Sequence, residues 1–269
     1  MGHGIAHAAI AAGYDTRLYD VTDAAVARGR AAIESIVAKG VDLGKVTAAD
    51  AAAMRRRLSA TARLAAALEG AEFIIEAAPE RIDVKLALFA QIEQLAPASA
   101  VIASNTSALS ITEMAGSLKS PSRVAGMHFF NPVHRMKLVE IVRALESAPA
   151  TLEAIEEVAR AMGKETVLVR ESPGFITTRV NASIGNEAFY MLMEGVASAR
   201  DIDKALKLGL NHPMGPFELV DLVGLDTRLS ILEYLHRSLG EKYRPCPLLA
   251  QYVKAGRLGR KAGRGVYDY

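Results

Sequence analysis

The first 172 residues alternate between short apolar runs and helical segments, and this alternation is the strongest constraint on the fold. Residues 72–76 and 100–103 are apolar runs of strand length, and a loop follows each of them, at 77–80 and at 104–107. The pattern is typical of an α/β domain with a mostly parallel sheet. Loops that follow parallel strands meet at one edge of the sheet, where ligands bind. Capping of the next helix is the alternative role for residues 104–107.

The N-terminal residues match the second half of a dinucleotide-binding unit. Residues 2–12 have apolar side chains at helical spacing, Gly13 favours a helix end, and residues 16–20 form a predicted strand that ends in Asp20. In such a unit an apolar strand and a Gly-x-Gly-x-x-Gly loop precede the helix, and Gly2 matches only the third glycine. We therefore expect a Rossmann-like sheet without its first strand, from a truncated chain or a reading frame that starts too late. The loss would leave two interior strands unpaired and weaken cofactor binding.

The pattern changes near Pro173, after which no convincing strand is found. We predict a Rossmann-like NAD-binding α/β domain over residues 1–172 and an all-α domain over residues 173–269. Further elements of the first domain are predicted helices at 22–39, 47–68, 81–95 and 151–163 and strands at 123–127, 137–142 and 166–169. The predicted helices of the second are 175–195, 200–208, 214–223, 226–239 and 246–256. The second domain is more apolar than its own packing requires, which predicts a homodimer through the C-terminal helices.

Two neighbouring predicted strands carry a histidine and a carboxylate. His128 lies at the end of one apolar run, an Asn131-Pro132 turn follows, and the next run carries Glu140. Strands joined by a turn can place these side chains together. A carboxylate that holds one imidazole nitrogen fixes the tautomer and raises the basicity of the other, which makes His128 a candidate general base. The alternative is a histidine bonded to backbone, with Glu140 solvated.

Composition argues against several classes of function. The net charge of +2 does not suit a dedicated nucleic-acid or anionic-membrane surface, and no apolar run approaches the ~20 residues of a membrane span. Cys246 is the only cysteine, so no intrachain disulfide can form and a reducing, cytoplasmic setting fits. His3 and His7 have a zinc-ligand spacing, but no Glu follows His3, and we predict no metal site.

Several motifs occur in a fixed order along the chain. They are IEAAPE (75–80), ASNTS (103–107), GMHFFNP (126–132), MKLVE (136–140), SPGF (172–175), HPMGPFEL (212–219) and LGRKAGRGVY (258–267). Together they resemble the short-chain L-3-hydroxyacyl-CoA dehydrogenases, which include bacterial 3-hydroxybutyryl-CoA dehydrogenase. The resemblance covers nearly the whole chain. It implies an NAD-dependent oxidoreductase of short-chain acyl-CoA metabolism that interconverts 3-hydroxybutyryl-CoA and acetoacetyl-CoA.

The resemblance also implies roles for individual residues. His128 would take the 3-hydroxyl proton while the hydride passes to NAD, and Glu140 would orient His128. The implied catalytic residues are His128, Glu140, Ser107 and Thr178. The implied cofactor-binding residues are Gly2, Asp20, Glu80, Lys85, Asn105, Ser107 and Lys261, and the implied substrate-binding residues are Ser107, Lys39, Asn131 and Asn181. For Lys39 and Lys261, a solvated surface charge is an equal alternative.

One position inside the motifs departs from the family pattern. The family places an asparagine immediately before the arginine that follows Pro-Gly-Phe, whereas here Thr178 precedes Arg179. A hydroxyl has a shorter reach and fewer hydrogen-bonding groups than an amide, so we expect impaired or retuned catalysis. Asn181, one helical turn on, can contribute. Two other interpretations stay open: a dehydrogenase of a free hydroxy acid of the sugar-acid type, and an inactive dimeric scaffold that lacks the first strand.

Overall fold

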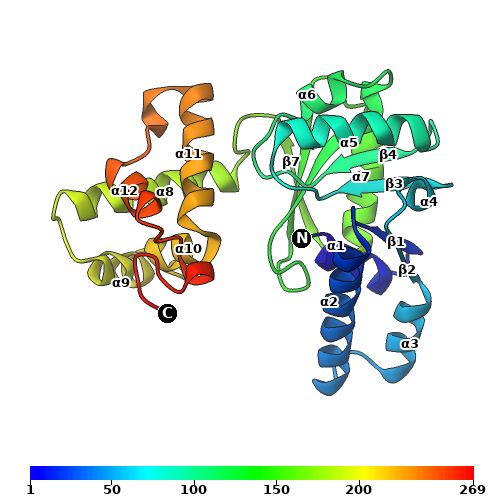
Figure 1. Ribbon diagram of the computed structural model, residues 1–269, viewed down its shortest axis with the longest axis horizontal. Helices are drawn as coiled ribbons and strands as arrows, with labels where there is room; N and C mark the ends of the chain where they lie inside the picture. Colours follow the sequence, from blue (N-terminus) through cyan, green and yellow to red (C-terminus); the bar gives the residue numbers. More distant parts are fainter. The chain divides into compact units, whose positions relative to one another are not determined.

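The computed structural model describes residues 1–269, which form two compact units, Met1–Glu171 and Ser172–Tyr269 (Figure 1). The first unit contains strands and helices, and the second is helical. The predicted fold class, an α/β Rossmann-like domain followed by an all-α domain, is confirmed. No helix in the structure combines the length and the apolar character that a membrane crossing requires.

The main sheet of the first unit has five strands in the order β3-β4-β5-β6-β7. Its pairings are parallel except for the antiparallel pair β5–β6. The strands are β3 (Phe73–Glu76), β4 (Val101–Ser104), β5 (Val124–Phe129), β6 (Leu138–Arg143) and β7 (Glu165–Arg170). Because β3, β4 and β5 are parallel, the loops after β3 and β4 and the end of β5 share one edge of the sheet.

A second, smaller sheet pairs β1 (Thr16–Tyr19) with β2 (Leu58–Thr61) in parallel. In the smaller sheet β1 pairs only with β2, and in the main sheet β3 pairs only with β4. Despite the apolar sequence of β3, Phe73, Ile74 and Ile75 are only partly buried, because β3 lies at an edge of its sheet.

The helices of the first unit follow the predicted segments with two exceptions. Residues 47–68 were expected to form one helix, but β2 interrupts them between α3 and α4, because Leu58–Thr61 pairs with β1. The short helix α6 was not predicted. Thr47 caps α3, since its hydroxyl accepts a hydrogen bond from the amide of Asp50. The helices are α1 (Gly2–Ala11), α2 (Asp23–Asp42), α3 (Ala48–Arg56), α4 (Leu64–Leu68), α5 (Ile82–Leu95), α6 (Ile111–Gly116) and α7 (Pro149–Ala161).

The core of the first unit lies where α1 and α7 pack on the main sheet. Ile5 of α1 and Ile155 of α7 share one buried cluster with Met127, Val139 and Ile141 of the two antiparallel strands. These residues are at most 4% exposed, and burying a large aliphatic side chain stabilises a fold by about 1.5–3 kcal/mol. The strands that carry His128 and Glu140 are therefore anchored in a buried core.

The second unit packs five α-helices around aromatic and leucine side chains. Phe189 and Phe217 stack edge to face with ring centroids 5.2 Å apart, and Leu232 and Leu235 complete the same cluster. The helices are α8 (Thr177–Met193), α9 (Ala199–Gly209), α10 (Pro216–Val223), α11 (Leu225–Leu239) and α12 (Pro247–Lys254).

Two buried carboxylates hold the C-terminal tail against these helices. Asp221 accepts hydrogen bonds from the amides of Val266 and Tyr267, and Asp203 accepts one from the Tyr267 hydroxyl. A Cβ atom at Gly265 would lie 2.0 Å from Asp221 Oδ1, so only glycine allows this approach. The tail is thus a packed part of the helical unit.

Candidate active site

His128 and Glu140 occupy directly opposite positions on β5 and β6. The imidazole Nδ1 of His128 lies 2.7 Å from Glu140 Oε2, and the two residues are 5% and 0% exposed. The Phe130 ring lies 4.6 Å from the imidazole centroid. A buried carboxylate at this distance holds the ring in one orientation and favours the tautomer with a proton on Nδ1. The structure therefore brings together the pair that the sequence singled out.

The two strands approach closely because of a glycine. A Cβ atom at Gly126 would lie 2.7 Å from the Cβ of Val142, its partner across the strand pair, and 3.2 Å from Ile111 Cδ1 of α6. Real side chains do not tolerate the shorter distance, so a larger residue would push β5 away from β6. Such a shift would separate His128 from Glu140, two positions further along.

A lysine side chain holds the connection between β5 and β6 by hydrogen bonds to its backbone. It starts with a cis Asn131-Pro132 bond, and the Lys164 ammonium donates to the carbonyls of Val133 at 2.5 Å and Met136 at 2.8 Å. Burial lowers the pKa of Lys164. Sequence analysis did not identify Lys164, whose function depends on a contact 28 to 31 positions away in the chain.

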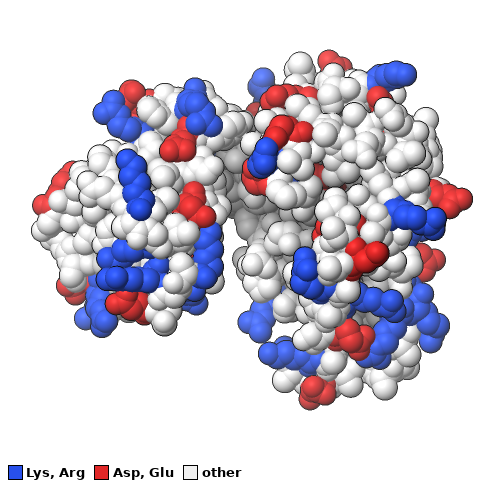
Figure 2. Space-filling model, in the orientation of Figure 1, with Lys and Arg blue, Asp and Glu red and all other residues white.

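Several cationic side chains act on the histidine of this connection. Burial and then the charges of Arg135, Lys164 and Lys39 lower the pKa of His134. None of the four makes an ion pair with an acidic residue in the structure. Figure 2 shows further Lys and Arg side chains gathered over α2 and α3. Lys39, predicted to contact the substrate, is one of these cationic groups.

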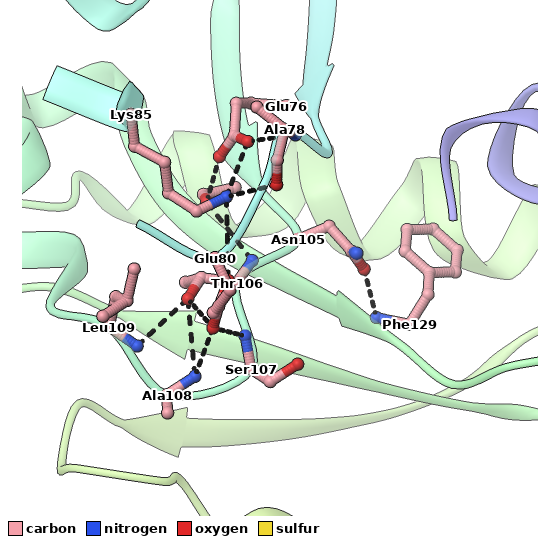
Figure 3. Close-up of polar contacts among 11 residues, drawn as sticks. Glu76, Ala78, Glu80, Lys85, Asn105, Thr106, Ser107, Ala108, Leu109 and Phe129 are labelled. Atoms are coloured by element: carbon pink, nitrogen blue, oxygen red, sulfur yellow. Dashed lines mark hydrogen bonds and ion pairs between the residues drawn. The ribbon is translucent and has the colours of Figure 1, made fainter. Parts of the chain in front are cut away.

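Ser107 lies in the loop after β4, and the carboxylate of Glu80 fixes that loop (Figure 3). Glu80 Oε1 accepts hydrogen bonds from the Ser107 amide and the Thr106 hydroxyl, both at 2.7 Å, and a longer one from the Ala108 amide at 3.2 Å. These bonds join the loop after β3 to the loop after β4. Two of the predicted site residues, Glu80 and Ser107, are therefore in direct contact.

Asn105 joins the same loop to the end of β5. Its side-chain oxygen accepts a hydrogen bond of 2.8 Å from the amide of Phe129, the residue after His128. Asn105 is 9% exposed. The Ser107 loop and the His128 strand are thus held together by a side chain that we expected at the cofactor.

Lys85 is predicted to contact the cofactor, but the structure places its ammonium group inside the unit. The residue is 1% exposed, and Nζ lies 2.7 Å from Glu76 Oε1, 3.2 Å from the Ala78 carbonyl oxygen and 3.8 Å from Glu80 Oε2. Glu76 was not predicted as a site residue. The sequence pattern that could have indicated it is an acidic residue at the end of an apolar strand, nine positions before a lysine on the next helix.

The remaining predicted residues are spread over the two units. Gly2 lies in the first turn of α1, Asn131 is exposed in the β5–β6 connection, and Asp20 is exposed after β1, where its Oδ1 accepts a bond of 2.8 Å from the Val21 amide. Thr178 and Asn181 belong to α8 of the second unit, where both are partly buried.

Lys261, a predicted cofactor contact, pairs with an acidic side chain of the second unit. Its ammonium group lies 2.6 Å from both carboxylate oxygens of Asp226. Asp226 lies in the first turn of α11, after Gly224, and the Lys261 side chain packs over that turn. The lysine therefore has a structural partner that its place in a basic tail did not reveal.

Known proteins resemble this chain over its whole length. Residues 1–172 match the family model of the 3-hydroxyacyl-CoA dehydrogenase NAD binding domain, and residues 174–269 match that of the C-terminal domain. A probable 3-hydroxybutyryl-CoA dehydrogenase of Bacillus subtilis is 46% identical over 100% of this chain and 94% of its own length. The 3-hydroxybutyryl-CoA dehydrogenase of Bradyrhizobium diazoefficiens is 43% identical over 100% and 92%. The crystal structure of (S)-3-hydroxybutyryl-CoA dehydrogenase from Ralstonia eutropha has a TM-score of 0.96 at 41% identity, covering 100% of this chain and 95% of that chain.

Proposed function

This chain belongs to the 3-hydroxyacyl-CoA dehydrogenase family, and from that premise we propose that it is an NAD-dependent 3-hydroxybutyryl-CoA dehydrogenase. The observation that carries the proposal is the buried contact of 2.7 Å between His128 and Glu140. It supplies an oriented base, which oxidation of a secondary alcohol requires. The two relatives named as 3-hydroxybutyryl-CoA dehydrogenases support the choice of a short acyl chain.

The proposed mechanism uses the imidazole as a general base. Glu140 holds Nδ1, so Nε2 is the atom that would take the proton of the substrate 3-hydroxyl group. As the proton moves to Nε2 and a hydride leaves C3, the C3–O bond becomes a carbonyl. The chemistry that NAD supplies is acceptance of that hydride. Glu140 stabilises the imidazolium that forms, and the reverse reaction returns the same proton to the product hydroxyl.

Polar residues that follow the carboxyl ends of three strands in the first unit are suited to binding a dinucleotide. Asp20 follows β1, Glu80 follows β3 and Ser107 follows β4. The exposed carboxylate of Asp20 suits the ribose hydroxyls of NAD, where it would repel the extra phosphate of NADP. The proposed cofactor contacts are Gly2, Asp20, Glu80, Asn105 and Ser107.

The substrate is proposed to be held as an acyl-CoA thioester. The positive field that surrounds Lys39 and His134 supports binding of the coenzyme A phosphates on the first unit. Ser107 and Asn131 are proposed to bind near the reacting carbon, and Thr178 and Asn181 of α8 are proposed as further substrate contacts.

A homodimer in the cytoplasm is the proposed state of the protein. Support for self-association comes from large apolar side chains exposed on the helical unit, among them Val180, Val196, Leu208 and Leu210, which are 54–76% exposed. A surface of this kind is typical of an oligomer interface. Analytical ultracentrifugation of the wild-type chain and of Leu208→Lys tests it, because the variant should sediment as a monomer.

The activity test measures loss of NADH absorbance with acetoacetyl-CoA, with free acetoacetate and with no substrate. We expect NADH consumption with the CoA thioester alone, and much slower consumption when NADPH replaces NADH. Comparable consumption of the free acid would point to a hydroxy-acid dehydrogenase. No consumption with either compound would favour the inactive scaffold.

A further inference from the structure

The Glu76 carboxylate is buried at the end of β3, away from any role described above. The residue is 3% exposed, and its two oxygens receive three donors. Oε1 accepts from the Ala78 amide at 2.6 Å and from Lys85 Nζ at 2.7 Å, and Oε2 accepts from the Ser104 hydroxyl at 2.6 Å. Removing a carboxylate from water is costly unless it is paired and fully hydrogen-bonded. The three donors meet this requirement for Glu76.

The Lys85 ammonium connects this buried carboxylate to a more exposed one. Lys85 bonds to Glu76 and to the Ala78 carbonyl oxygen, and its third neighbour is Glu80 Oε2 at 3.8 Å. The Glu80 side chain is 41% exposed, so its attraction to Lys85 and its bonds to the Ser107 loop are what hold it in place. Figure 3 shows this connected series of side chains between β3, α5 and the loop after β4.

The series begins and ends on the same loop. Ser104, at the end of β4, donates to Glu76, while the Ser107 amide, three residues later, donates to Glu80. The loop is therefore tied at both ends to one charged cluster of two carboxylates and one ammonium group. A shift of Lys85 would move Glu80 and with it the amide of Ser107.

We propose that Glu76 is a positioning residue for the Ser107 loop and that it acts through Lys85 and Glu80. Lys85 is then an internal counter-ion that positions Glu80. This inference rests on the proposed function, because the position of Ser107 affects turnover only if the chain is the proposed dehydrogenase. The cluster affects kcat more strongly than NADH affinity, because it positions Glu80 and Ser107, which are only two of the proposed cofactor contacts.

The first test removes both charges. In Glu76→Gln/Lys85→Met the unpaired buried charge of either single variant is avoided, so the unfolding free energy should return close to the wild-type value. We expect kcat at saturating NADH to stay at least 10-fold low, with a smaller rise in the NADH Kd from fluorescence titration, because Glu80 and Ser107 are also proposed cofactor contacts. A double variant with wild-type kcat would show that the pair only balances charge, and would overturn the proposal. A rise in NADH Kd equal to or larger than the fall in kcat would show that Lys85 acts by binding the cofactor directly, and would also overturn it.

The second test uses a smaller change that preserves folding. Ser104→Ala removes the hydrogen bond to Glu76 and a longer one, of 3.3 Å, from the Thr106 amide. Ser147→Ala is its matched control, because that buried hydroxyl also donates one bond, to the Val124 carbonyl at 2.6 Å, and accepts one, from the Ala144 amide at 3.0 Å. Both should destabilise the chain similarly, but only Ser104→Ala should lower kcat, by 3-fold or more. Equal kcat in the two variants would overturn the proposal.

Hydrogen exchange separates failure of this inference from failure of the proposed function. The Ser107 amide should exchange at least 10-fold faster in Ser104→Ala than in the wild-type chain and at the wild-type rate in Ser147→Ala. This readout needs no turnover, so it stands even if the wild-type chain does not oxidise NADH. Unchanged protection of the Ser107 amide in Ser104→Ala would refute the connection through Glu76, whatever the activity.

Discussion

Replacing Glu140 by glutamine tests whether the negative charge of Glu140 stabilises the His128 imidazolium during the reaction. Glutamine has nearly the same shape and can still accept the Nδ1 hydrogen bond of His128, which is 2.7 Å long in the wild-type structure. It carries no charge, so it cannot stabilise the imidazolium that forms when His128 takes the substrate proton. The change therefore acts on the transition state and leaves the ground-state geometry in place.

The size of the effect follows from the contact. A unit charge about 4 Å from another, at the effective dielectric constant of about 20 that describes protein sites, gains about 4 kcal/mol. A neutral hydrogen bond that remains recovers about 0.5–1.5 kcal/mol of this. The net loss of about 2.5–3.5 kcal/mol lowers kcat by about 70- to 400-fold. KM should change little, because the interaction is lost mainly in the transition state.

The assay compares steady-state kinetics and urea unfolding of Glu140→Gln with those of Glu165→Gln, a control on the exposed start of β7. We expect Glu140→Gln to keep the wild-type stability or to gain about 1 kcal/mol, because a buried carboxylate no longer has to be desolvated. The control should match the wild type in both measurements. A Glu140→Gln enzyme that turns over within 3-fold of the wild type would refute the assigned role.

Three further variants test other parts of the account. Thr178→Asn should change kcat or KM with acetoacetyl-CoA, and a variant with both constants unaltered would remove Thr178 from the site. Lys164→Met should lower the unfolding free energy by about 2–3 kcal/mol in urea titrations, because the carbonyls of Val133 and Met136 lose a charged donor; a loss below 0.5 kcal/mol would contradict the anchoring role. Burial and then the charges of His134 and Lys164 lower the pKa of His7 from 6.5 to about 4. Between these two pH values the His7 imidazole therefore stays neutral in the folded state and takes up a proton in the unfolded state. Stability should therefore fall as pH drops from 6.5 to 4, by about 1–2 kcal/mol after solvent screening, and His7→Gln should lose that part of the slope; an equal slope in both proteins would exclude His7.

The parts that the sequence could predict are those that local patterns encode. The β5–turn–β6 segment is apolar on both sides of Asn131-Pro132, so strand pairing and the contact of His128 with Glu140 followed from one short stretch. Thr47 was recognisable as a helix cap because capping depends on neighbours within one turn.

The parts that could not be predicted depend on contacts between distant segments. Residues 58–61 lie in an alanine-rich region with high helix propensity, yet pairing with β1 makes them a strand. The contact of Glu76 with Ser104 requires the register of β3 against β4, which no local pattern fixes. Lys261 lies among basic residues and was expected to contact the cofactor or solvent, and its partner Asp226 lies 35 positions away in the chain.

The most direct test of the central claim is the kcat of His128→Gln with acetoacetyl-CoA at saturating NADH. Loss of the general base should lower kcat by about 100- to 10,000-fold, while the NADH Kd and the unfolding free energy stay near their wild-type values. A His128→Gln protein that reduces acetoacetyl-CoA at the wild-type rate would contradict the account of this site as a dehydrogenase centre.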